Sequence, residues 1–240
     1  MLNFAVRNRK EIFRDPLSVF LGIALPIVLL VVFTTIEKNA PLDTFKAINL
    51  TPGLIVFSFA FLTMFSALLI AKDKQSALLK RLSASPLRTV DYVIGYALPM
   101  LPLSIFQTLI CYIIAMFLGL TADILDILAS TVLLLPLAMM STFLGLFLGA
   151  LFTEKQISGI GTIYITLVSF LGGAWMDISL LGETFEKISH ALPFVHGIEL
   201  ARDVIAGNYA TFNEHFWWTI GYAVLTFVLA QLAFKKMFRR

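Results

Sequence analysis

The chain has 240 residues, of which 59% are hydrophobic and 14% are charged, and its mean hydropathy is +0.89. Soluble domains carry about 25% charged residues, so this composition excludes an ordinary soluble domain and favours a membrane protein. The net charge of +3 is modest, and the basic residues are placed by membrane topology, so nucleic acid is excluded as a partner. The single cysteine, Cys111, excludes an intrachain disulfide and a multi-cysteine metal site.

The spacing of apolar and charged residues over positions 2–14 predicts an amphipathic helix. Its predicted apolar face comprises Leu2, Ala5, Val6, Ile12 and Phe13. Its predicted polar face comprises Arg7, Lys10, Glu11 and Arg14. Such a helix would lie along the membrane interface before the chain turns into the bilayer near Pro16. The alternative is a charged flank that only sets the topology.

Six uncharged apolar runs predict six transmembrane helices, because each has about 18 residues or more. The runs are Leu17–Thr35, Leu50–Ala71, Val93–Leu120, Ile127–Phe152, Ile157–Trp175 and Phe216–Phe234. Backbone amides in hydrocarbon must be satisfied within the segment, so these runs should be helical. Prolines lie within the runs at 26, 99, 102 and 136. Kinks there could serve a moving transporter, but simple packing irregularity is the commoner explanation. We therefore predict one all-α polytopic domain over residues 1–240.

The basic residues predict the orientation of these helices. Fourteen of the 18 lysines and arginines flank the spans on one side, and four, Lys38, Lys46, Lys187 and Arg202, flank them on the other. Positive residues accumulate on the cytoplasmic side, so both termini are predicted to be cytoplasmic. The expected location is the cell membrane, that is, the plasma or inner membrane, with membrane lipids as neighbours.

The longest predicted cytoplasmic connection, residues 72–92, contains a short helix with leucines on one side. Leu78, Leu79 and Leu82 form that side, and Ser85-Pro86 ends the helix because a residue before proline avoids helical angles. Exposed leucines beside basic residues can form a docking element for a partner protein, but the residues alone favour a loop without such a role. An ordinary topology-setting loop is the alternative.

Residues 176–213, on the predicted extracytoplasmic side, contain two helical segments that are too short to span the bilayer. Phe185, Ile188 and Leu192 repeat at helical spacing before Pro193 interrupts, and a second helix runs from there to a stop signal at Gly207. We predict a helical hairpin that re-enters or lies on the outer leaflet.

The six runs contain no Asp, Glu, Lys, Arg or His, which argues against a proton-driven transporter. The sequence also lacks a phosphate-binding loop of the form GxxxxGK[ST] and an HExxH motif. No catalytic residue, metal site or bound cofactor is predicted, so any uphill transport would need energy from another chain. A lipid-modifying enzyme would have to use Asp177, Glu183, Glu186 and His190, whose spacing fits a solvated helix face better.

Two local patterns make the sequence resemble the membrane subunits of ABC-2 type (type 2 ATP-binding-cassette) transporters. The family's first cytoplasmic loop has an acidic-basic pair followed by Gly-Thr, Leu and Ser-Pro. Here Asp73, Lys74, Leu82 and Ser85-Pro86 match, whereas Ser76 and Ala77 replace Gly-Thr. Before the last span the family has Leu-Pro, then Arg and Gly, which correspond to Leu192-Pro193, Arg202 and Gly207.

The resemblance implies a permease subunit of an ABC transporter, which is not itself an ATPase. ATP and Mg²⁺ would be bound by a separate ATPase subunit, and a second permease copy or a paralogue would complete the dimer. The implied coupling helix that seats on the ATPase comprises Ser76, Leu78, Leu79, Arg81, Leu82, Ser85 and Pro86. An accessory or immunity membrane protein without transport activity is the alternative.

The resemblance also implies a transport path along the dimer seam and an extracytoplasmic gate. The implied path residues are Phe57, Phe61, Phe65, Thr162, Tyr164, Thr166 and Phe170. The implied gate residues are Leu192, Pro193, Glu199, Arg202 and Gly207. A seam rich in phenylalanine and free of charge suits a hydrophobic or amphipathic cargo such as a drug, lipid or peptide, and the family analogy favours export.

Overall fold

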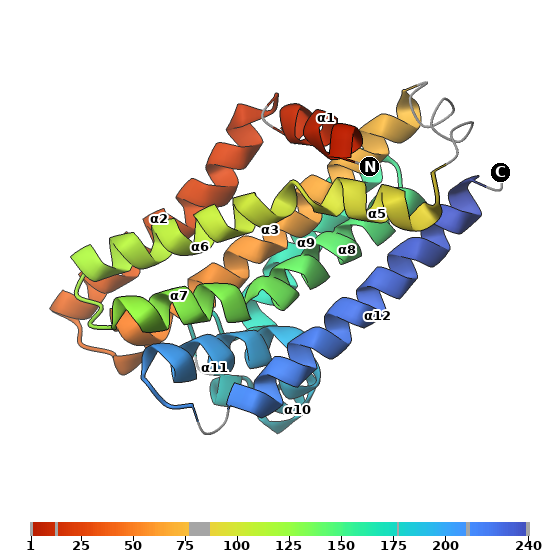
Figure 1. Cartoon of the computed structure of the whole chain (residues 1–240). Coiled ribbons are helices and arrows are strands. Elements are labelled where there is room, and N and C mark those ends of the chain that lie inside the picture. The colour runs from red at the N-terminus through yellow and green to blue at the C-terminus, as the bar shows by residue number, and fades with distance from the viewer. Residues whose placement is uncertain (1, 13, 77–86, 177, 210–211, 239–240) are drawn as a thin grey trace.

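The computed structural model describes residues 2–12, 14–76, 87–176, 178–209 and 212–238, and every regular element in those ranges is a helix. The elements in chain order are α1 (Leu2–Ile12), α2 (Pro16–Asn39), η1 (Asp43–Phe45), α3 (Ala47–Gln75), α5 (Thr89–Ala97), α6 (Met100–Phe117), α7 (Ile124–Leu133), α8 (Leu135–Leu151), α9 (Glu154–Leu171), η2 (Ile178–Leu181), α10 (Glu183–Ala191), α11 (Pro193–Ile205) and α12 (Phe212–Phe238). The predicted all-α class is confirmed. The long helices form a bundle with the N- and C-terminal ends at the same end (Figure 1).

Five helical stretches in the described ranges are long and apolar enough to cross a membrane: Val19–Asn39, Ala47–Gln75, Thr89–Phe117, Ile124–Leu151 and Phe212–Phe238. They correspond to the predicted spans one to four and six. The remaining predicted span, 157–175, coincides largely with α9, whose first turn carries Glu154 and Lys155. Helix α9 is not among the five, so the count of six stays a prediction.

The third and fourth spans are each broken into two helices at positions that contain proline. Helix α5 ends and α6 begins around Leu98 and Pro99, while α7 gives way to α8 at Leu134, two residues before Pro136. Proline has no backbone N–H and its ring clashes with the preceding turn, so it interrupts the hydrogen-bond ladder. Breaks thus lie beside Pro99 and Pro136, whereas α2 continues through Pro26 and α6 through Pro102.

Side chains from other helices satisfy two of the carbonyl groups that prolines leave without a helical partner. Pro99 cannot donate to the carbonyl of Gly95, four residues before it, and the buried Asn8 amide donates to that oxygen at 3.1 Å. In the same way, Gln107 donates at 3.3 Å to the carbonyl of Gly22, which Pro26 leaves free. Because an unsatisfied carbonyl is costly in a membrane, each bond fixes one helix against another.

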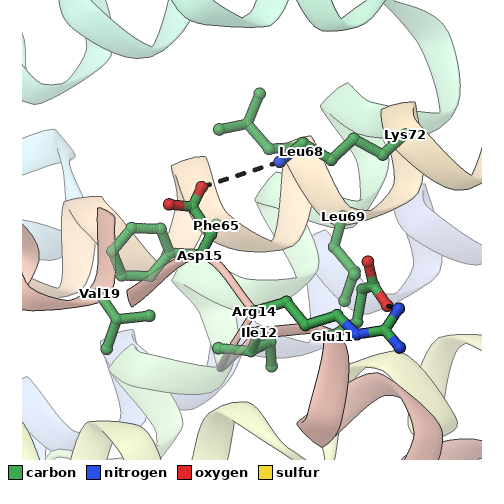
Figure 2. Close-up of a pocket in the computed structure, with 9 residues that line it drawn as sticks. All are labelled: Glu11, Ile12, Arg14, Asp15, Val19, Phe65, Leu68, Leu69 and Lys72. Atoms are coloured by element: carbon green, nitrogen blue, oxygen red, sulfur yellow. Dashed lines mark hydrogen bonds and ion pairs between the residues drawn. The ribbon is translucent and has the colours of Figure 1, made fainter. Parts of the chain in front are cut away.

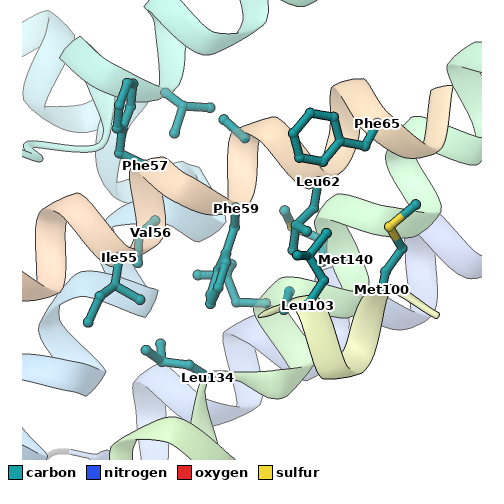
Figure 3. Packing of buried hydrophobic residues seen from close by; sticks show 14 of the residues in the cluster. Ile55, Val56, Phe57, Phe59, Leu62, Phe65, Met100, Leu103, Leu134 and Met140 are labelled. Atoms are coloured by element: carbon teal, nitrogen blue, oxygen red, sulfur yellow. The ribbon is translucent and has the colours of Figure 1, made fainter. Parts of the chain in front are cut away.

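Helix α3 forms the centre of the bundle, since 83% of its membrane-span window is buried, against 28% for α2 and 22% for α12. Its large apolar side chains, among them Phe59 and Leu62, pack with Met100 and Met140 (Figure 3). Helix α8 approaches α3 closely: a Cβ added to Gly145 would lie 2.2 Å from the carbonyl oxygen of Thr63. Small residues permit such contacts between membrane helices.

Helices α10 and α11 lie at the end of the bundle opposite the chain termini (Figure 1). Leu192 is the extended residue between them, and Pro193 is the first residue of α11, where proline fits the helix start. Gly207 closes α11 with a φ of 70°, a left-handed angle that suits glycine. Two helices and a stop at Gly207 agree with the sequence pattern, and the re-entry of this pair into the membrane stays a prediction.

Candidate functional site

A buried ionic cluster joins three helices at the end of the bundle that carries both termini. We call Arg7, Asn8, Asp73 and Tyr96 the Asp73 cluster. Arg7 of α1 binds the Asp73 carboxylate with two nitrogens, at 2.5 and 2.8 Å, and the Tyr96 hydroxyl of α5 donates to it at 2.7 Å. Asp73 itself is only 3% exposed. The cluster therefore ties the end of α3 to α1 and to α5.

The charges of the cluster compensate each other. The hydrogen bond to Asp73 raises the pKa of Arg7 above its ordinary high value, so the guanidinium stays charged. A two-pronged arginine–carboxylate contact is among the strongest hydrogen-bonded pairs in proteins. Removing Arg7 would leave the Asp73 carboxylate without its counterion in a site that is mostly closed to water. The cluster is thus a specific attachment point for α1.

Apolar packing supports the same attachment. The Phe4 ring makes edge-to-face contacts with Tyr92 and Tyr96, at centroid distances of 5.9 and 4.8 Å. A Cβ on Gly95 would lie 2.6 Å from the Phe4 ring, so the glycine allows α1 to approach α5. Asn8, which is fully buried, completes the contact through the carbonyl of Gly95.

The structure confirms a helix at the N-terminus but corrects its predicted faces. Ala5 and Ile12 are buried as expected, whereas Val6 is 44% exposed. Arg7, assigned to the polar face, turns towards the bundle. The reason is that Arg7 and Asn8 find a carboxylate and a free carbonyl there, which a count of apolar residues cannot anticipate. The Leu2 side chain and Phe13 lie outside what the structure describes.

Lys74, next to Asp73, binds the end of α8. Its ammonium donates to the carbonyls of Gly149, Ala150 and Phe152, at 3.1, 2.9 and 3.0 Å. The last carbonyls of a helix have no partner within the helix, and a cation there also complements the helix dipole. The acidic-basic pair 73–74 therefore holds the end of α3 to α1 and α5 on one side and to α8 on the other.

Of the predicted coupling residues, Ser76 alone falls within the described residues. It ends α3, and its hydroxyl donates to the carbonyl of Asp73 at 2.9 Å. Leu78, Leu79, Arg81, Leu82, Ser85 and Pro86 lie outside the described residues. Asp73, the centre of the cluster, thus lies three residues before Ser76, the first of the predicted coupling residues.

The predicted path residues lie in two environments. Phe57 and Phe65 are buried at 4% and 8% exposure, with Phe61 half-buried between them, and all three pack inside the protomer. On α9, Thr162, Thr166 and Phe170 are exposed, whereas Tyr164 points inward against Phe194. The structure does not bring the seven together: the outward-facing members belong to α9.

The predicted gate residues all lie in or beside α11, at the opposite end of the bundle, and two of them, Glu199 and Arg202, are in contact. Arg202 pairs with Glu199 at 2.8 Å and donates to the carbonyl of Asn49, in the first turn of α3, at 3.2 and 3.1 Å. These contacts border a cavity of about 360 Å³ between α3, α9, α10 and α11. Pro193 is buried, Leu192 is half-buried and Gly207 is exposed. Arg202 therefore fixes α11 to the start of the central helix.

A histidine pair, which the sequence analysis did not single out, joins α11 to α12. The Nδ1 atoms of His196 and His215 lie 2.9 Å apart, and Nε2 of His196 lies 2.9 Å from the carbonyl of His190. The carbonyl accepts only from an N–H, so Nε2 of neutral His196 carries the proton and Nδ1 accepts from His215. The His196 ring also stacks on Trp218, at a centroid distance of 4.8 Å.

We expect this pair to make the protein less stable in acid. Burial is the main cause that lowers the pKa of His196, and the charge of His215 lowers it further. When the pKa of a histidine is lower in the folded state than in the unfolded state, protonation favours the unfolded state. The contribution of this histidine to stability is therefore fully present above its unfolded-state pKa of about 6.5 and is lost as the pH falls below that value. The other titratable groups facing it are His190 and Glu214.

The measurement is the melting temperature of the purified protein at several pH values, from about 7.5 to about 5.5, around the ordinary histidine pKa. The wild type should melt at lower temperature in acid, and His196→Phe, which keeps a ring to stack on Trp218, should show a smaller shift. Equal pH dependence of the two proteins would refute this role of His196.

Glu186 and His190, two of the four residues that a lipid-modifying enzyme would have to use, line the cavity of about 360 Å³ beside Arg202. Glu183 is exposed and pairs with Lys187 at 2.6 Å, and Asp177 lies outside the described residues. No set of three His, Cys, Asp or Glu side chains in the described part of the chain has metal-binding geometry.

Comparisons with known proteins agree with the resemblance stated above. Residues 3–206 match the family model for the ABC-2 type transporter. Nodulation protein J of Sinorhizobium fredii (strain NBRC 101917 / NGR234) is 46% identical over 41 residues, which are 17% of this chain and 16% of that protein. The matched segment thus spans about a sixth of that relative.

Proposed function

This chain belongs to the ABC-2 type transporter family, and we propose that it is a permease subunit that exports a hydrophobic or amphipathic substrate. The energy would come from ATP hydrolysed, with Mg²⁺, by a separate ATPase subunit. The observation that carries the proposal is the family match over residues 3–206 together with five membrane-length helices. Both termini would be cytoplasmic in the cell membrane, in keeping with the bias of lysine and arginine.

The Asp73 cluster supports a route from the ATPase to the membrane helices. The predicted coupling segment follows α3 directly, and α3 is held at that end by Arg7 and Tyr96. A push on the segment would therefore act on the central helix, on α1 and on α5 together. An ATPase can favour one conformation of the permease only through contacts that differ between the two conformations. The cluster provides a rigid connection for such contacts.

The outward face of α9 supports a second permease copy as partner. Ile163, Leu167 and Phe170 are 63%, 49% and 47% exposed, with Thr162 and Thr166 beside them. The two threonine hydroxyls bond to carbonyls of their own helix, at 3.0 and 2.9 Å, so this face offers few polar groups. An uncharged face of this kind suits a dimer seam and an apolar cargo. The second copy would be identical or a paralogue.

Transport can be measured in inside-out membrane vesicles that contain the chain and its ATPase. ATP should drive accumulation of an amphipathic fluorescent dye, and a non-hydrolysable ATP analogue or the omission of the ATPase should abolish it. Ile163→Asn on α9 should remove most of this uptake. Val224→Asn on α12, which alters a side chain of similar exposure at 57%, should leave it unchanged.

Each outcome addresses a different part of the proposal. Uptake that does not need ATP would contradict the ABC permease mechanism. ATP-dependent uptake that both variants lose equally would contradict the α9 seam. Absence of uptake, together with absence of ATPase association, would favour the accessory or immunity protein.

A further inference from the structure

An apolar groove lies between α1, α2 and α6, at the same end of the bundle as the Asp73 cluster. Its volume is about 480 Å³. Seven of its eight lining residues are apolar and one is charged: Arg9, Ile12, Val19, Ile23, Pro99, Pro102, Leu103 and Phe106. Phe106 is 53% exposed, so the groove has an open apolar wall. The outward-facing residues of α9 do not line it.

A second hollow lies on the other side of the α1–α2 turn. That hollow is lined by charges of both signs, and they pair with each other: Arg14 binds Glu11 at 3.0 Å, and Lys72 lies 3.8 Å from Asp15 (Figure 2). Arg9 forms no ion pair with any residue in the described ranges. The groove therefore presents an uncompensated cation beside an apolar surface.

We propose that this groove binds an anionic phospholipid, with the phosphate on Arg9 and one acyl chain along the apolar wall. Helix α1 lies across the end of the bundle, and α2 and α6 run away from it (Figure 1). A headgroup at Arg9 would thus sit at the level of α1, while Ile23, Leu103 and Phe106 line the path of the chain.

Charge selects the kind of lipid. A guanidinium binds phosphate oxygens with two parallel hydrogen bonds, and an anionic headgroup is attracted more than a zwitterionic one. This end of the bundle is the predicted cytoplasmic one, and the cytoplasmic leaflet carries anionic lipids. Bound there, the lipid would fill the space between α1 and the two membrane helices. The proposal does not depend on transport or on the identity of the cargo.

The test is binding of phosphatidylglycerol to the purified, delipidated full-length chain, measured by native mass spectrometry. We expect one lipid per chain to be retained preferentially. Arg9→Gln should weaken its binding about fivefold, the factor that corresponds to roughly 1 kcal/mol for one basic residue near an anionic surface. Lys10→Gln is the matched control, because it removes the same charge from the neighbouring exposed position, outside the groove. It should change binding less than twofold, a small fraction of the expected Arg9 effect.

Three ligands separate the proposed site from other sources of binding. Phosphatidylcholine, short-chain phosphatidylglycerol and inorganic phosphate should each bind more weakly than long-chain phosphatidylglycerol. Equal binding of phosphatidylcholine, or equal losses in the two variants, would overturn the proposal in favour of a diffuse basic surface. Tight binding of phosphate alone would overturn the role of the acyl chain. An unchanged melting temperature of Arg9→Gln verifies that the variant is folded.

Discussion

Arg7→Gln is expected to destabilise the protein by about 3 kcal/mol, the low end of the cost of breaking a buried ion pair. The carboxylate of Asp73 is only 4% exposed, so after the substitution it would retain the Tyr96 hydroxyl but no positive charge. Asp73→Asn should cost less, about 1 to 2 kcal/mol, because Arg7 is 35% exposed and its guanidinium can turn to water. This asymmetry follows from the unequal burial of the two partners.

A double-mutant cycle measures the pair directly. Arg7→Gln combined with Asp73→Asn should cost clearly less than the sum of the single changes, since the double variant holds no unpaired charge. The free energy of unfolding in mixed micelles is the quantity to compare. Arg14→Gln serves as control, because it removes an arginine from an exposed pair with Glu11, and it should leave stability unchanged. Additive costs of the two single variants would show that Arg7 and Asp73 do not act as a unit.

The same variants bear on function. If α1 transmits the motion of the ATPase, Arg7→Gln should lower the ATPase activity of the assembled complex while the ATPase still co-purifies. Loss of stability without any change in ATPase activity would restrict the Asp73 cluster to a structural role.

The long apolar runs predict most of the fold because a bilayer imposes a simple length rule. Five of the six predicted spans coincide with membrane-length helices, and the two local motifs point to the family that the residue 3–206 match shows. Helix α9 does not meet the same criterion of length and apolar character, because Glu154 and Lys155 lie inside its first turn. The prediction started that span at Ile157, after the charges, and so counted an apolar run rather than a helix.

The candidate site was harder to predict, since it depends on contacts between residues far apart in the sequence. The Asp73-Lys74 pair was visible as a family motif, but its burial was not, because α3 continues as a helix beyond the apolar run that ends at Ala71. No local sequence pattern indicates that Arg7 and Asn8 belong to the Asp73 cluster. The signal for Asn8 was the proline at 99, which leaves the carbonyl of Gly95 in need of a donor.

The path residues illustrate a different limit. Phe57, Phe61 and Phe65 were assigned to the path because the resemblance implies a seam along the second span. A resemblance does not say whether a given helix face meets a partner or the chain's own helices. In the structure Phe65 packs against α2, where a Cβ on Gly22 would lie 2.6 Å from its ring. Residues on the outward face of α9 are therefore the better candidates for a seam, and Ile163 and Leu167 join Thr162, Thr166 and Phe170 there.

Substitutions in the predicted coupling segment should strongly weaken ATPase binding. Leu78→Asp/Leu82→Asp would place two carboxylates in a surface that should seat in an apolar groove of the ATPase. A central contact residue of an interface contributes about 2 kcal/mol or more, so the double variant should weaken ATPase binding by at least about 30-fold. Leu180→Asp/Phe185→Asp is the control, because these residues are exposed at 76% and 51% on the opposite, predicted extracytoplasmic side.

Co-purification of the chain with its ATPase from membranes, compared among these three proteins, tests whether the chain is a permease that binds an ATPase through residues 76–86. We expect capture by the wild type and by the Leu180/Phe185 control, and loss of capture by the Leu78/Leu82 variant at equal membrane insertion. Failure of the wild type to capture an ATPase would contradict the permease function itself. Capture that survives Leu78→Asp/Leu82→Asp would contradict the assigned coupling segment.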